Sequence, residues 1–261
     1  NPLRLYGAQE AGMKMTKRVL LTAAVMAAAS FGFMGCAADD DENDMIEKVD
    51  SNNYSINYTN GDSTVSRGYK ATTLKHQGAV VEFKFTNAKN AGTSEGGVLG
   101  FIWELEEKNG ARNFCVLGIR QKDGVPSYYV SKFTNVTDIT ALNFGAPDNG
   151  AVEDEVVKAF QTLGDGFVDG STVTVYADIA PCNGGYEIYF YKTEGSAKSH
   201  NTGEAIGNKV SVTSSLVTAN EQPPQKNLAI YANVYAGKTL TGSWKFVDTY
   251  KDAELAEADA E

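Results

Sequence analysis

The sequence predicts an all-β protein built as an antiparallel β-sandwich with one short helix. Apolar and polar residues alternate in many short segments, as in "AVVEFKFT", residues 79–86. Pairs that contain glycine and suit tight hairpin turns separate several of these segments. Strand-like segments do not alternate with helical ones, which argues against a parallel α/β sheet and for two packed antiparallel sheets.

The N-terminal part has the pattern of an export signal. Basic residues between positions 14 and 18 precede the apolar run 19–33, and the chain turns acidic directly after Gly35-Cys36. The run is shorter than the roughly 20 apolar residues that a transmembrane helix needs. A buried core helix is the alternative, but such a helix does not require the abrupt acidic stretch. Residues 1–12 precede the possible start methionines, and we expect them to lie outside the mature protein.

Residues 33–36, Phe-Met-Gly-Cys, resemble the lipobox of bacterial lipoproteins. In that family the signal is cut before the cysteine, which then carries the lipid. The resemblance implies a signal peptide at 13–35, lipidation (palmitate) of Cys36, and a bacterial envelope location at the outer membrane, on its surface or its periplasmic face. Phe33 and Met34 depart from the usual leucine and small residue. Several acyl chains on one cysteine give stable anchoring.

Composition divides the rest of the chain into a tether, a domain and a tail. Residues 36–58 are polar and rich in Asp, Asn and Ser, so we expect a flexible acidic tether. The sandwich domain is expected over residues 59–250. The acidic end, residues 251–261, is expected to form a frayed tail.

The charge balance restricts the partners. The chain has 33 Asp and Glu against 23 Lys and Arg, a net charge of −10. Nucleic-acid binding depends on basic side chains that meet phosphates, so this class of partner is excluded. Anionic lipid headgroups would be repelled as well, and we therefore expect membrane contact through the lipid on Cys36.

The strongest strand signal lies between residues 98 and 134. The segments "VLGFIWELE", "RNFCVLGIR" and "SYYVSKFT" are separated by turns that contain Asn109-Gly110 and Asp123-Gly124. These residue types tolerate the positive φ that tight hairpins require. The pattern predicts a three-stranded antiparallel meander.

The remaining elements are two hairpins, a helix and a weak strand. "STVTVYADIA" with "YEIYFYKT" predicts one hairpin over residues 171–193, and "LAIYANVYA" with "TGSWKFVDTY" predicts another over 228–250. Apolar residues at helical spacing in "AVEDEVVKAFQTLG", residues 151–164, predict the short helix. A weak strand is expected within residues 209–217.

The closing segment "GSWKFVDTY", residues 242–250, resembles the last strand of concanavalin-A-like jelly rolls, which end on a small-aromatic-x-Phe-x-Asp pattern. The resemblance covers this segment alone. It implies a jelly-roll-type sandwich, the same architecture that the strand count indicates.

Beyond Cys36 the chain has two cysteines, Cys115 and Cys182. Export would place them where disulfides persist, yet buried free cysteine is also common. The sequence therefore leaves open whether they pair. We expect neither a metal site nor a cofactor, because His76 and His200 lie at no ligand spacing from a cysteine.

Two segments offer catalytic residues, and neither fits its motif. "GTSEG", residues 92–96, matches the G-x-S-x-G of serine hydrolases, but that motif needs a strand-turn-helix and a strand follows here. Glu104 and Glu106 are expected on one strand face, about 7 Å apart, which could suit paired carboxylates of glycoside hydrolysis. This segment resembles the E-x-D-x-x-E of jelly-roll glucanases, but Asn109 stands at the last acidic place. We therefore expect no catalytic residues, and the question of enzyme activity stays open.

Aromatic residues in strands are the remaining indication of function. Trp103, Tyr128 and Tyr129 are the candidate ligand-binding residues. Neighbours on a strand point to opposite faces, so one of the two tyrosines is expected to be exposed. An exposed flat ring can stack on a sugar or anchor a protein partner.

Taken together, these features predict a lipid-anchored envelope protein that acts as a non-catalytic binding module for a glycan or a host protein. Two alternatives stay open. One is a divergent jelly-roll glycoside hydrolase or lyase that uses Glu104 and Glu106. The other is a structural envelope lipoprotein without a soluble ligand.

Overall fold

The computed structural model describes residues 45–86, 96–139 and 153–251, and only the backbone of residues 153–156. These residues belong to one compact unit, Glu42–Glu261.

Several predicted features lie outside the described residues. They are the upstream residues, the signal peptide, Cys36, most of the "GTSEG" segment and nearly all of the acidic tail. Within the described stretches, no helix is long and apolar enough to cross a membrane.

In the described part of the chain, fourteen strands form two antiparallel sheets. Sheet A contains β1 (Ile46–Lys48), β2 (Asn53–Thr59), β4 (Gly78–Phe85), β9 (Val168–Asp169), β10 (Thr172–Cys182), β11 (Gly185–Tyr191), β12 (Val210–Thr213) and β14 (Thr239–Tyr250). Sheet B contains β3 (Ser66–His76), β5 (Gly97–Lys108), β6 (Ala111–Lys122), β7 (Val125–Val136), β8 (Glu153–Thr162) and β13 (Lys226–Val234).

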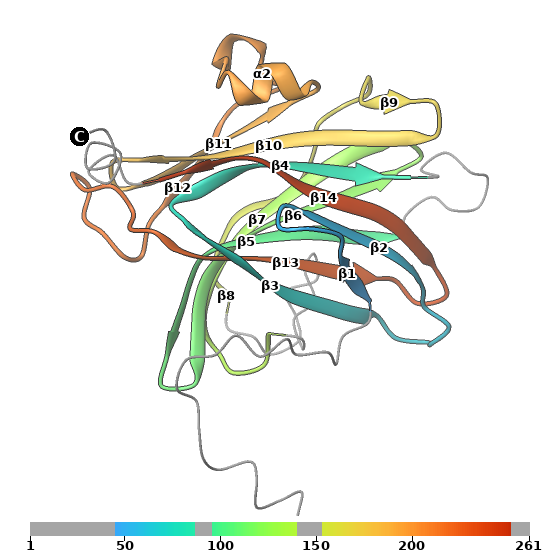
Figure 1. Ribbon diagram of the computed structural model, residues 1–261, viewed down its shortest axis with the longest axis horizontal. Coiled ribbons are helices and arrows are strands. Elements are labelled where there is room, and N and C mark those ends of the chain that lie inside the picture. The colour runs from blue at the N-terminus through green and yellow to red at the C-terminus, as the bar shows by residue number, and fades with distance from the viewer. Residues whose placement is uncertain (1–44, 87–95, 140–152, 252–261) are drawn as a thin grey trace, which may run out of the picture. The chain divides into compact units, whose positions relative to one another are not determined.

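The strand order places β12 and β8 at the ends of their sheets. Sheet A runs β1-β2-β14-β4-β10-β11-β12, with β9 beside β10, and sheet B runs β3-β13-β5-β6-β7-β8. The chain alternates between the sheets from β2 to β5 and again from β12 to β14, and Figure 1 shows the resulting layers. The predicted antiparallel β-sandwich is confirmed.

Large aromatic side chains fill the space between the sheets. Trp244 of β14 is fully buried, and its indole nitrogen donates a hydrogen bond of 3.0 Å to the carbonyl of Gly100 on β5. Phe101 stacks on Trp103 at 5.8 Å and meets Phe246 edge-on at 5.9 Å. The centre of the sandwich is therefore closed by apolar contact and by one hydrogen bond that crosses from sheet A to sheet B.

The meander is confirmed as β5, β6 and β7. Its turns use positive φ at both central residues: 56° and 77° at Asn109 and Gly110, and 52° and 86° at Asp123 and Gly124. Two positive φ values in a two-residue loop match the right-handed twist of the strands that it joins. The hairpin β10–β11 and the weak strand β12 are also confirmed.

The helix predicted for residues 151–164 is wrong, because this segment forms the edge strand β8. Val157 packs into the core between the sheets, whereas Phe160 packs on the opposite face of sheet B. Three residues apart, these side chains would share a helix face, but on a strand they separate. Phe160 stacks on Tyr129 at 5.5 Å and lies 3.7 Å beneath the guanidinium of Arg120. The tertiary contacts that this segment makes as a strand therefore outweigh the helical spacing of its apolar residues.

The short helices that the structure describes lie elsewhere. They are α2 (Glu194–Lys198) and the 3₁₀ helix η2 (Thr202–Glu204), both between β11 and β12. The hydroxyl of Thr193 caps α2 by accepting from the amide of Ser196 at 3.2 Å.

The hairpin predicted for residues 228–250 is also wrong. Strand β13 pairs with β3 and β5 in sheet B, whereas β14 pairs with β2 and β4 in sheet A. The connection is a corner between sheets. Asn60, fully buried, fixes it: its side-chain amide donates to the carbonyl of Val234 at 2.9 Å, and its backbone amide donates to Lys238 at 2.8 Å.

The tether predicted for residues 36–58 is wrong from residue 45 onward. Strands β1 and β2 extend sheet A, and Ile46, Tyr54 and Ile56 are buried in the core. In β2 the polar residues alternate with these apolar ones and face outward. The abundance of Asn and Ser thus reflects the outer face of a strand, and the domain begins earlier than residue 59.

The aromatic centre gives a test of the fold. We expect Trp244→Ala to lower the free energy of unfolding by about 3–5 kcal/mol, because it removes a large buried side chain and the inter-sheet hydrogen bond. Val49→Ala is the control, since Val49 is 61% exposed and its truncation is expected to cost less than about 0.5 kcal/mol. Urea unfolding monitored by circular dichroism measures both. Equal midpoints would show that Trp244 does not hold the sheets together.

Candidate functional site

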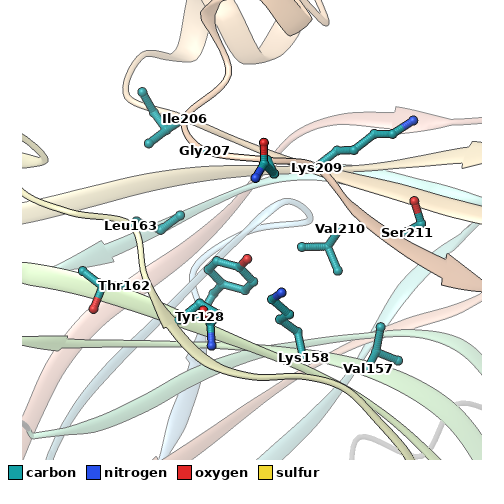
Figure 2. A pocket seen from close by; sticks show the side chains of 12 residues that line it. Tyr128, Val157, Lys158, Thr162, Leu163, Ile206, Gly207, Lys209, Val210 and Ser211 are labelled. Carbon is teal, nitrogen blue, oxygen red and sulfur yellow. The ribbon is translucent and has the colours of Figure 1, made fainter.

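A pocket of about 480 Å³ lies at the side of the sandwich where the edge strands β8 and β12 come together. One wall is β8 with the residues after it, and the other is the segment 206–211, which leads into β12. Figure 2 shows side chains from both walls around this space. Six polar residues line it: Lys158, Gln161, Thr162, Asn208, Lys209 and Ser211.

Tyr128 of β7 lies between the two walls and forms the floor (Figure 2). Its ring packs against Phe190 of β11, with centroids 4.4 Å apart, and its side chain is 7% exposed. Burial raises the pKa of the Tyr128 phenol, so the hydroxyl stays protonated at neutral pH. The floor is therefore a fixed aromatic ring with a neutral polar end.

Backbone hydrogen bonds hold both walls in place. The amide of Ile206 donates to the carbonyl of Phe190 at 2.7 Å, which fixes the segment 206–211 to β11. The amide of Leu163 donates to the carbonyl of Pro126 at 2.9 Å, which fixes the end of β8 to β7. The pocket is thus built on both sheets and does not depend on a free loop.

Of the three candidate ligand-binding residues, only Tyr128 lines this pocket. Trp103 is fully buried and meets Tyr186 edge-on at 5.9 Å inside the sandwich. Tyr129 is 3% exposed and lies on the opposite face of sheet B. The expectation that one of the two tyrosines is exposed is wrong, because the outer face of sheet B carries its own apolar cluster, which includes Ile102 and Val116.

Glu104 and Glu106 do not form an open pair of acids. A bulge interrupts β5 between Trp103 and Glu106, and Glu104 has a φ of 55°. The side chain of Glu104 is 2% exposed and accepts hydrogen bonds from the hydroxyls of Ser214 and Ser215. Glu106 instead forms an ion pair with Lys226 at 3.1 Å. The bulge turns Glu104 away from solvent, an arrangement that does not favour catalysis by this pair.

The structure describes two cysteines, Cys115 and Cys182. Cys115 is buried, and its thiol lies 3.7 Å from the carboxylate of Glu104. Cys182 is partly exposed, and burial raises the pKa of its thiol. The sequence left open whether these two cysteines pair, and in the structure they do not form a disulfide with each other. Among the described residues, no group of three or more His, Cys, Asp or Glu side chains could hold a metal ion.

A polar cluster that the sequence did not reveal lies beside α2. Asp178 of β10 is 1% exposed and accepts from the hydroxyl of Tyr250 at 2.6 Å, while its other oxygen lies 2.8 Å from Nδ1 of His200. The hydroxyl of Tyr250 is also 2.7 Å from that nitrogen. Burial raises the pKa of the Asp178 carboxyl, although the contacts with His200 and Tyr250 act in the opposite direction.

This cluster fixes the segment that carries one pocket wall. His200 follows α2, and the chain runs from there through η2 to Ile206. An ion pair between Glu194 and Lys245, at 3.0 Å, holds the start of the same segment on β14. Asp178, His200 and Tyr250 are far apart in the sequence, so no local motif could have revealed them.

The polar residues of β8 could not be recognised as part of a site from the sequence pattern. Lys158, Gln161 and Thr162 lie within the segment 151–164, for which the sequence pattern predicts a helix, and nothing in that pattern indicates that Tyr128 lies beside them. The pairing of β8 with β7 aligns them beside Tyr128.

Comparison with known proteins identifies no family. No family model matches the chain, and no curated protein matches it. Among solved structures, a legume lectin-like domain from Entamoeba histolytica matches with a TM-score of 0.43 and 12% sequence identity, covering 80% of this chain and 87% of that chain. A match at this level establishes neither the ligand nor the activity of this chain.

The raised pKa of Asp178 predicts a pH dependence of stability. Between the ordinary pKa and the raised one, the folded state binds more protons than the unfolded state, so this carboxyl lowers stability as pH rises. In Asp178→Asn that contribution is absent. We therefore expect the free energy of unfolding of the wild type to fall relative to that of the variant from pH 3.5 to pH 7. Urea titrations at several pH values test this, and a constant difference would contradict it.

Proposed function

We propose that this chain is a lipid-anchored protein of the bacterial envelope whose sandwich binds a glycan, without cleaving it, in the pocket between β8 and the segment 206–211. The pocket itself carries the proposal: a tyrosine floor lies beneath amide and hydroxyl side chains from two sheets. Its volume of about 480 Å³ suits a small ligand or one end of a longer one.

The chemistry of the lining supports a sugar. Gln161 and Asn208 come from opposite walls, and each side-chain amide can both donate and accept hydrogen bonds, as sugar hydroxyls require. Thr162 and Ser211 add hydroxyls that can do the same. Tyr128 adds an aromatic surface with little rotational freedom to lose.

The same lining supports binding without cleavage. The described residues that line the pocket include no carboxylate and no histidine. Glycoside hydrolysis by the usual routes needs two carboxyl groups beside the scissile bond. Glu104 is buried elsewhere in the sandwich, so the glycosidase alternative has no support from the geometry of its proposed acids.

The anchoring part of the proposal rests on the sequence before residue 45. We expect the full chain, expressed in a bacterium, to incorporate radiolabelled palmitate at Cys36 and to fractionate with membranes. Cys36→Ala should remain unlabelled. An unlabelled wild-type chain would contradict anchoring but would leave the pocket proposal untouched.

Glycan binding is tested by a glycan array, followed by titration calorimetry with the sugars that bind. We expect Gln161→Ala to weaken binding by about 3- to 10-fold, the usual effect of losing one hydrogen bond. Gln222→Ala is the matched control, because Gln222 is exposed and lies outside the pocket. An array without any binder, together with capture of a host protein that Gln161→Ala leaves unchanged, would refute the proposal.

A further inference from the structure

The described lining of the pocket is positively charged, although the protein as a whole is acidic. The whole chain has a net charge of −10, yet the described pocket lining contains two lysines and no acidic residue. A neutral sugar needs no such local excess of positive charge.

The two lysines are not equivalent. Lys209 forms an ion pair with Glu187, a residue outside the lining, and Figure 2 shows its side chain directed away from Tyr128. Glu187 also accepts a hydrogen bond of 2.6 Å from the hydroxyl of Tyr189. These contacts, first of all the one with Lys209, lower the pKa of Glu187, so its carboxylate stays ionised at neutral pH. The charge of Glu187 offsets that of Lys209.

Lys158 is different, because its side chain makes no ion pair or hydrogen bond in the described part of the structure. It lies on β8, and Figure 2 shows its ammonium group directed toward the space above Tyr128. It is therefore the one lining cation whose charge is available to a ligand.

We propose that this pocket selects acidic sugars, with the Lys158 ammonium facing the negative group, a carboxylate or a sulfate ester, while Gln161 and Asn208 bind hydroxyls. The proposal rests on the glycan-binding function and names its ligand class. An ammonium group acts as a point charge toward such anions and does not require a fixed approach. Its position on a paired strand fixes where the negative group must lie.

The test compares ligands that differ only in charge. Titration calorimetry on the full chain would use trigalacturonate, its methyl ester, which keeps the ring and linkage but lacks the charge, and a sulfated galactotriose. We expect the methyl ester to bind at least tenfold more weakly than trigalacturonate. If the sulfated sugar binds and trigalacturonate does not, the negative group that the pocket selects is a sulfate ester. That result also supports the proposal.

Variants of Lys158 connect this preference to one side chain. We expect Lys158→Gln to lose at least tenfold in affinity for the acidic sugar that binds, with no change for the methyl ester. Lys158→Arg should stay within about threefold, since it keeps the charge. Lys108→Gln is the matched control, because Lys108 is exposed beside the β5–β6 turn and does not line the pocket. Circular dichroism checks that each variant is folded.

The outcomes separate the two proposals. Equal binding of trigalacturonate and its methyl ester, or full affinity in Lys158→Gln, would overturn acidic selectivity while glycan binding at the pocket stands. Absence of binding to every sugar, neutral or acidic, would overturn both.

Discussion

The contact between the two sheets at their aromatic centre is the constraint on which the rest of the structure depends. Trp244 links β14 to β5, and Phe101 packs against Phe246 across the same interface. This contact fixes how far apart the sheets lie and how they are rotated relative to each other. Because both sheets extend from that centre to edge strands, the positions of β8 and β12 follow from it. The pocket is the space that remains where these two edges meet.

Two further interactions fix the positions of the residues around the pocket. Lys132 of β7 donates a hydrogen bond of 2.6 Å to the hydroxyl of Thr213 on β12, which joins sheet B to sheet A near the pocket. Tyr128 fills the gap below by packing against Phe190. Strand edges usually carry unpaired backbone groups that invite another strand. Here the polar side chains of β8 and of the connection before β12 border the gap, so it is lined by groups that can form hydrogen bonds.

Local sequence predicted what depends on local chemistry. The Asn109-Gly110 and Asp123-Gly124 turns need residues that accept positive φ, so the meander could be predicted in advance. Strand β8 could not, because its structure depends on pairing with β7 and on the stack of Phe160 with Tyr129. The bulge that buries Glu104 is likewise invisible in the sequence, and so are the partners of Asp178. Tyr128, which the sequence suggests as a ligand-binding residue, lines the pocket, but the residues around it come from segments that only the tertiary structure brings together.

A positively charged pocket can attract an anion even though the protein as a whole is acidic. The reason is that nearby charges act on a bound ligand much more strongly than distant ones. Two unit charges 4 Å apart near a protein surface interact by about 4 kcal/mol. Exposed charges farther away than the Debye length, about 8 Å at physiological ionic strength, are largely screened. An acidic sugar in the pocket would therefore experience Lys158 strongly and most of the net charge of −10 weakly. Over the rest of the surface the same net charge disfavours adhesion of acidic polymers. In the pocket, by contrast, no carboxylate of the described lining offsets the charge of Lys158.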